Sequence, residues 1–133
     1  MNVRLIALLA CALALSQSAC SPPTYAQACH TPLPHWRTES DRLDHEGWFH
    51  ELRIDAQGRL LEDGETQISD VQLADRIRRW GWLQPIPQVI VNPDPAAPCD
   101  RVQAIRAMLE ASRLCRAMQH IKCFEGRRDH IVR

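Results

Sequence analysis

Gln88-Val89-Ile90-Val91-Asn92 is the stretch that decides the fold of this 133-residue chain. Three consecutive β-branched aliphatic residues are typical of a short strand inside a sheet that helices cover. Helical patterns occur on both sides of this run, so strand and helix alternate around it. We therefore expect residues 88–92 to form an interior strand, with Ile90 at its centre.

The helix before this strand is marked by a capping box, in which two side chains three residues apart satisfy free backbone amides at the helix start. Here the box consists of Ser69 and Gln72, and Gly81 and Pro85 end the helix. An apolar stripe follows at helical spacing, made of Leu73, Ile77 and Trp80. The pattern predicts a helix that packs one face against a sheet.

A second capping box, Asp100 with Gln103, predicts the helix after the strand. Its inward stripe consists of Val102, Ile105, Leu109 and Ser112. Alanines elsewhere in this segment raise its helix propensity. A last strand is predicted within residues 117–124.

Strand periodicity begins at Trp48, ahead of both helices. Residues at alternate positions share one strand face, namely Trp48, His50, Leu52 and Ile54. Turn chemistry at 55–58, a short return strand at 59–61 and a second turn at 62–65 follow. The order β-β-α-β-α-β predicts an α+β two-layer sandwich, in which a mixed four- to five-stranded sheet carries two helices on one face.

The first residues predict export. Arg4 is followed by the apolar run Leu5 to Leu15, which is about half of the roughly 20 residues that span a bilayer. Small residues then lead to Cys20, where cleavage would expose an amino-terminal cysteine for lipid attachment. Cleavage after Ser18, Ala19 or Ala28, which would give a soluble product, is the alternative. The expected location is the periplasm, with anchoring to a membrane as a lipoprotein.

The length that remains after cleavage is consistent with one domain, because about 115 residues do not support two independent cores. We expect a signal peptide at 1–19, a Pro-rich tether at 20–46 with a docked piece around Cys29 and Trp36, the α/β domain at 47–126 and a basic tail at 127–133. Removal of Arg4 leaves 15 basic against 16 acidic residues. This balance, without a basic stripe, argues against nucleic acid as a partner.

Four segments appear in the order of a known family: Ile54-Asp55-Ala56-Gln57-Gly58, Ile68-Ser69-Asp70-Val71-Gln72-Leu73, Val89-Ile90-Val91-Asn92-Pro93-Asp94 and Arg101-Val102-Gln103-Ala104-Ile105-Arg106-Ala107-Met108. This order resembles the periplasmic domain of the ExbD/TolR family of biopolymer-transport proteins, over roughly residues 48–124. The resemblance implies a domain that binds envelope proteins or the cell wall.

The chain also departs from that family. Family members act beside a proton-conducting partner through a membrane helix that carries an essential aspartate, whereas the apolar segment here contains no acid. The insertion 95–98 lengthens a loop, and Cys115 stands where the family usually has a turn glycine. Proton coupling is therefore not expected.

The cysteines predict disulfides, because an even set in a small exported domain usually pairs. The set consists of Cys29, Cys99, Cys115 and Cys123. A helix between Cys99 and Cys115 would hold them over about 20 Å apart, too far for a bridge. If the last two strands are parallel, Cys99 and Cys123 both lie at the carboxyl ends of these strands and therefore at the same edge of the sheet. This arrangement favours the bridges Cys99–Cys123 and Cys29–Cys115. Cys115–Cys123 with Cys29–Cys99 stays open, as does a single bridge.

No pattern in the chain predicts catalysis, a metal or a cofactor. Asp44-His45-Glu46 with His50-Glu51 does not have the spacing of a zinc site, and His120 fits a sheet position better than a general base. Phosphate loops, dinucleotide fingerprints and nucleophile motifs are also absent from the sequence. We therefore expect a non-enzyme.

Two residues are the candidates for binding. Trp80 belongs to the core stripe, but Trp82 lies beyond Gly81, where an exposed aromatic residue often anchors a partner. Asp94 closes the valine-rich segment of the family resemblance.

The first functional hypothesis is an ExbD/TolR-type envelope binding module that contacts envelope proteins or peptidoglycan, with homodimer formation left open. The alternative is a lipoprotein inhibitor or immunity protein that plugs an envelope hydrolase with the loop 92–99.

Overall fold

The computed structural model describes residues 21–38, 48–116 and 123–127. In chain order these residues form the short π-helix η1 (Tyr25–Cys29), strands β1 (Arg37–Thr38), β2 (Phe49–Ile54), β3 (Leu60–Glu62) and β4 (Thr66–Ile68), helix α2 (Asp70–Trp80), strand β5 (Gln88–Pro93), helix α3 (Cys99–Glu110) and strand β6 (Cys123–Glu125). Cys20, residues 44–46 and His120 lie outside the described residues. Among the described helices, none has the length and apolar character that crossing a bilayer requires.

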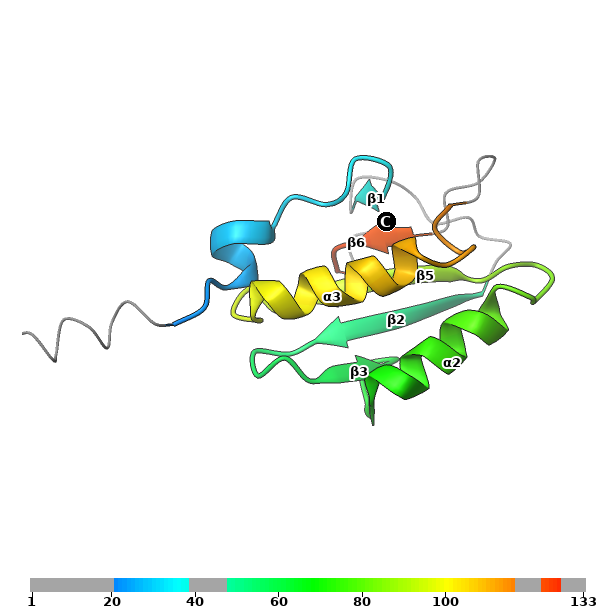
Figure 1. The fold of residues 1–133 in the computed structure, drawn as a ribbon, viewed down its shortest axis with the longest axis horizontal. Coiled ribbons are helices and arrows are strands. Elements are labelled where there is room, and N and C mark those ends of the chain that lie inside the picture. Colours follow the sequence, from blue (N-terminus) through cyan, green and yellow to red (C-terminus); the bar gives the residue numbers. More distant parts are fainter. Residues whose placement is uncertain (1–20, 39–47, 117–122, 128–133) are drawn as a thin grey trace, which may run out of the picture.

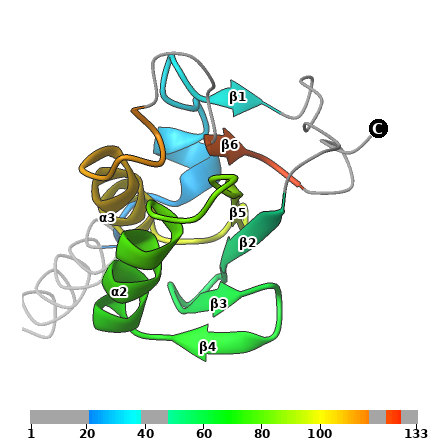
Figure 2. The same ribbon diagram turned by 90° about the vertical axis from the view of Figure 1, so that its right-hand side faces the viewer.

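The sheet is mixed and has the strand order β1-β6-β5-β2-β3-β4. Strand β5 pairs in parallel with β2 and β6, whereas β3 is antiparallel to both β2 and β4. Helices α2 and α3 lie side by side on one face of the sheet (Figures 1 and 2). The predicted α+β two-layer sandwich is confirmed. The described residues form six strands, because β4 and the two-residue β1 extend the predicted order at its two edges.

Strand β5 is the interior strand that the sequence predicts. Val89, Ile90 and Val91 have no exposed surface. Val89 and Val91 belong to the main core beneath the helices, whereas Ile90 points to the opposite face and packs with Phe124 and the partly buried Phe49. Apolar burial on both faces of one strand explains why the run is continuous rather than alternating.

Helix α2 begins as predicted, since the Gln72 amide donates to Ser69 Oγ (3.2 Å) and the Ser69 amide donates to Gln72 Oε1 (2.8 Å). The stripe residues Leu73, Ile77 and Trp80 are buried. The Trp80 ring stacks on His50 of β2, with 4.3 Å between the ring centroids. The prediction that Trp48 shares a strand face with Leu52 and Ile54 is wrong, because Trp48 precedes β2 and is 62% exposed.

The capping box predicted for the second helix is also wrong. Helix α3 begins at Cys99 with Pro98 as its N-cap residue, and no side chain caps it. The Val102 amide already donates to the Pro98 carbonyl (3.2 Å), which places Asp100 within the first turn. There Asp100 Oδ1 accepts from the Arg101 amide (2.7 Å).

The segment expected mainly as a tether packs against the sandwich over its described part. The Tyr25 amide donates to the Ala97 carbonyl (2.7 Å), and the Cys99 amide donates to the Pro23 carbonyl (2.9 Å). Cys29 and Trp36 are buried, and β1 pairs with β6. We call residues 21–38 the N-terminal strap, since they lie along the α3 and β6 side of the sandwich (Figure 1).

Within the described residues, two disulfides join Cys29 to Cys99 and Cys115 to Cys123, with Cα separations of 5.8 and 5.3 Å. The favoured pairing of Cys99 with Cys123 and Cys29 with Cys115 is therefore wrong. Strands β5 and β6 are parallel, as that argument assumed, but Cys123 is the first residue of β6 and lies opposite Val89 near the start of β5. Cys99 follows the carboxyl end of β5 and therefore lies at the other end of the sheet. Cys29, the last residue of η1, lies at the same end.

Candidate functional site

An apolar groove of about 400 Å³ lies between α2 and the end of α3. Its lining consists of Ala74, Ile77, Arg78, Gly81, Trp82, Met108, Ala111, Ser112 and Arg113. The small residues of this lining are Ala74, Gly81, Ala111 and Ser112, and its larger apolar residues are Ile77, Trp82 and Met108. The groove is therefore a concave surface on the helical layer, at the end of the sandwich where β5 begins.

Trp82 reaches this groove because α2 ends just before it. The Gly81 amide donates to the Ile77 carbonyl (3.1 Å), and the Trp82 amide then donates to the Arg79 carbonyl (3.1 Å) in a tight turn. Trp80 is 5% exposed and Trp82 is 71% exposed. The prediction that Trp80 packs inward and that Trp82 lies on the surface is confirmed.

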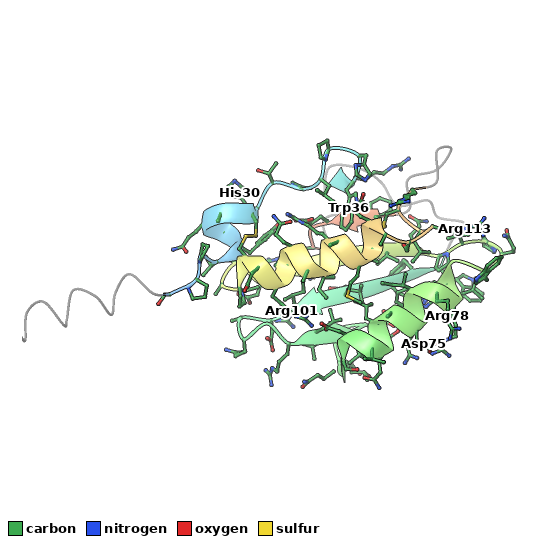
Figure 3. All side chains as sticks on the ribbon, in the orientation of Figure 1. His30, Trp36, Asp75, Arg78, Arg101 and Arg113 are labelled. Atoms are coloured by element: carbon green, nitrogen blue, oxygen red, sulfur yellow. A yellow bond between two sulfur atoms is a disulfide. The ribbon has the colours of Figure 1, made fainter. Side chains whose placement is uncertain are left out.

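In the part of the chain that the structure describes, the charged residues that line the groove are Arg78 and Arg113. The Arg113 guanidinium lies over the Trp82 ring, 5.0 Å from its centroid, in a cation–π arrangement. Arg78 Nη2 donates to Asp75 Oδ1 (2.6 Å), and this hydrogen bond, with the neighbouring charges of Arg78 and Arg79, lowers the pKa of the Asp75 carboxyl. The labels of Arg78 and Arg113 mark the same end of the helical layer in Figure 3.

Asp94 lies at the opposite end of β5 from Trp82. Its amide donates to the Ile54 carbonyl (2.8 Å), and its Oδ1 accepts from the Ala96 amide (2.8 Å). It contributes to a polar cleft of about 240 Å³ that is lined by Glu51, Arg53, Gly64, Asn92, Pro93, Asp94, Pro95 and Arg127. The two predicted binding residues therefore do not form one site.

The carboxylates near that polar end are mostly engaged in structural contacts. Arg101 Nη2 donates to Asp70 Oδ1 (2.6 Å), and this hydrogen bond lowers the pKa of Asp70. Burial works to raise the pKa of Asp55, but hydrogen bonds from Arg59 and Gln57 outweigh it, so that pKa also lies below its usual value. Asp70 joins the start of α2 to α3, and Asp55 holds the turn after β2.

A buried ion pair between Arg106 and Glu125 is the main polar feature that sequence reasoning missed. Their side chains are 3% and 0% exposed. Arg106 Nε donates to Glu125 Oε2 (2.9 Å), and the Tyr25 hydroxyl donates to Glu125 Oε1 (2.9 Å). One signal was present, because Arg106 lies four residues after Val102 and three before Leu109, on the inward row of α3.

His50 and Glu51, whose spacing in the sequence argues against a metal site, lie on opposite faces of β2. His50 faces the helices and stacks on Trp80, whereas Glu51 faces the other side and accepts a hydrogen bond from Asn92 Nδ2 (2.8 Å). Within residues 21–38, 48–116 and 123–127, no three His, Cys, Asp or Glu side chains gather in a way that could hold a metal ion.

No protein-family model, curated protein or solved structure matches this chain. The resemblance to the ExbD/TolR family thus rests on the order of its four segments. In the structure these segments form the end of β2 with its turn, the start of α2, most of β5 with Asp94, and α3 from Arg101 onward.

Proposed function

We propose that this protein is a non-enzymatic binding module of the cell envelope, of the ExbD/TolR type but without the proton-coupled membrane helix. Its partner is an envelope protein or peptidoglycan. The observation that carries the proposal is Trp82, a large aromatic side chain that is 71% exposed beside an apolar groove. Exposed apolar surface of this kind marks interaction sites, and tryptophan is enriched among the residues that dominate binding energy.

The disulfides support an extracytoplasmic setting for this module. Bridges between Cys29 and Cys99 and between Cys115 and Cys123 form and persist in oxidising compartments. Together with the apolar segment after Arg4, they favour export to the periplasm.

Site-specific photo-crosslinking in intact cells tests the binding function. A benzophenone amino acid in place of Arg78, which lines the groove and is highly exposed, should yield adducts with envelope proteins or peptidoglycan fragments. The same amino acid in place of Gln67, which is exposed on edge strand β4 away from the groove, is the matched control. Adducts that are absent at position 78, or equal at both positions, would overturn the proposal. An adduct with one hydrolase alone would instead identify the inhibitor or immunity protein.

Membrane anchoring is proposed through Cys20. Palmitate supplied to growing cells should label the protein, and Cys20→Ala should abolish the label and release the protein as soluble material, because a single cysteine carries the lipid. Cys11→Ala, which changes a cysteine inside the apolar segment, should leave the label unchanged. An unlabelled wild-type protein, or a Cys20→Ala variant that stays in the membrane, would contradict lipidation.

A further inference from the structure

We propose that the groove binds an acidic amphipathic helix of a partner protein, whose apolar side chains enter the groove while its flanking carboxylates pair with Arg113 and Arg78. This inference rests on the proposed binding function and specifies the chemistry of the partner. It follows from three properties of the groove, which are its shape, its lining and its charge.

The shape suits a helix that approaches closely. Ala74 on α2, Gly81 just after α2 and Ala111 just after α3 add little side-chain bulk to the lining. A methyl group built onto Gly81 would meet no atom closer than 3.6 Å. A helix laid into a hydrophobic groove anchors itself through residues at i, i+3, i+4 and i+7. A volume of about 400 Å³ accommodates one or two such anchors.

The apolar lining can adapt to those anchors. Ile77 and Met108 provide the larger apolar surfaces of the groove, and methionine adjusts its unbranched side chain to different shapes. Trp82 at the margin adds a flat, rigid surface that can cover an incoming aliphatic side chain. The same residues therefore provide both the contact area and the exclusion of water that strengthens nearby charge pairs.

The charge of the groove selects the sign of the partner. Among the described residues, no acidic side chain lines the groove and no carboxylate pairs with Arg113, whose guanidinium lies against Trp82. Arg78 is already bonded to Asp75, but its side chain is 74% exposed and retains free donors. A partner with carboxylates beside its apolar stripe gains attraction at both arginines, whereas a basic partner is repelled.

A concave surface favours a helix over the two other occupants that an apolar and basic patch can take. An anionic lipid bilayer presents a flat surface and would leave the groove between α2 and α3 unfilled. A second copy of this chain would need an acidic amphipathic surface, whereas the exposed residues at the end of α2 include Arg78 and Arg79. Both occupants are outcomes of the test below.

The test measures fluorescence anisotropy of two labelled helical peptides, each about 16 residues long, with the purified protein and both disulfides intact. The peptides share leucines at i, i+3, i+4 and i+7, and they differ only in carrying glutamates or lysines beside that stripe. The acidic peptide should bind roughly tenfold or more tightly than the basic one. Trp82→Ala should weaken binding of both peptides, and Arg113→Glu should abolish or reverse the preference.

Matched controls separate the groove from general surface effects. Trp48→Ala removes the other highly exposed tryptophan, and Arg53→Glu reverses a charge that does not line the groove, so both should leave the preference unchanged. Equal affinity for the two peptides, or an unchanged preference in Arg113→Glu, would overturn the proposal. Unchanged circular dichroism and melting temperature establish that each variant is folded.

The remaining outcomes identify other occupants. Binding to phosphatidylglycerol vesicles but to neither peptide, with loss in Trp82→Ala, would assign the groove to lipid. Dimerisation in sedimentation experiments that disappears in Trp82→Ala would assign it to a second copy. Photo-crosslinks from position 78 without any acidic preference would preserve the binding function and refute only this partner chemistry, whereas missing crosslinks would refute the function itself.

Discussion

Replacing Glu125 with alanine should lower the free energy of unfolding by about 3–5 kcal/mol. The substitution leaves the Arg106 guanidinium, whose side chain is 3% exposed, without its carboxylate partner. It also removes the hydrogen bond from the Tyr25 hydroxyl to Glu125. Leaving one buried charge unpaired lowers the free energy of unfolding far more than replacing both charges with apolar groups. The reason is that the desolvation penalty of the remaining charge persists while the attraction to its partner is lost. Urea denaturation followed by circular dichroism measures the effect.

Two further variants distinguish loss of the pair from loss of packing. The double variant Arg106→Met with Glu125→Leu replaces both charges with apolar groups of similar length and should restore part of the stability lost in Glu125→Ala. The recovery is partial because the carbonyls of Cys29 and Thr31 lose their Arg106 donor. Tyr25→Phe removes one hydrogen bond and should cost about 1 kcal/mol. A loss below about 1 kcal/mol for Glu125→Ala would show that the pair is not buried in solution.

Removing the bridge between Cys29 and Cys99 should lower stability by about 4 kcal/mol, through the double variant Cys29→Ser with Cys99→Ser. The sequence separation of 70 residues makes this a long closed loop, and the unfolded chain regains the corresponding entropy when the bridge is absent. For a domain of this size the melting temperature should fall by roughly 15 °C or more. Thermal denaturation under non-reducing conditions measures the shift.

The second disulfide is the matched control. Cys115 and Cys123 are separated by 8 residues, so Cys115→Ser with Cys123→Ser should cost only about 2–3 kcal/mol. Peptide mapping of the oxidised wild-type protein should find these two bridges and no others. An equal loss in both double variants would contradict the loop-length argument, and a Cys99–Cys123 peptide would contradict the arrangement of β6.

The buried pair and the first disulfide fasten the same part of the molecule. Arg106 Nη2 donates to the carbonyls of Cys29 (2.8 Å) and Thr31 (3.1 Å), so one guanidinium joins α3, β6 and the N-terminal strap. The N-terminal strap is thus attached to the sandwich at neighbouring residues, by a disulfide and by hydrogen bonds from a buried guanidinium. Their effects on stability should not be additive, because neighbouring interactions share the same ordering cost.

The groove was partly visible from the sequence. The helix stop at Gly81 separates the inward Trp80 from the outward Trp82, and this distinction follows from helical periodicity alone. The lining from α3 was not visible, because Met108, Ala111 and Arg113 have no pattern that places them opposite α2. Which helix faces meet depends on how both helices cross the sheet, and that is a tertiary property.

Local sequence patterns were sufficient to predict most of the elements and the faces that they bury. The β-branched run at 89–91, the capping box of α2 and its apolar stripe each act within a few residues of chain, and each has the predicted structure. Their order along the chain was enough to assign the two-layer sandwich, because short connections between such elements permit few arrangements.

The long-range pairs, in contrast, depend on the packing of the whole chain. Cys29 joins Cys99 because the N-terminal strap packs across the loop after β5, and its prolines and few aliphatic residues gave no periodic signal for that docking. Arg106 and Glu125 pair because the fold excludes water from both at once, a condition that neither residue's neighbours in sequence can impose. Local patterns report which surface an element buries, whereas the partner on that surface is selected by the packing of the whole chain.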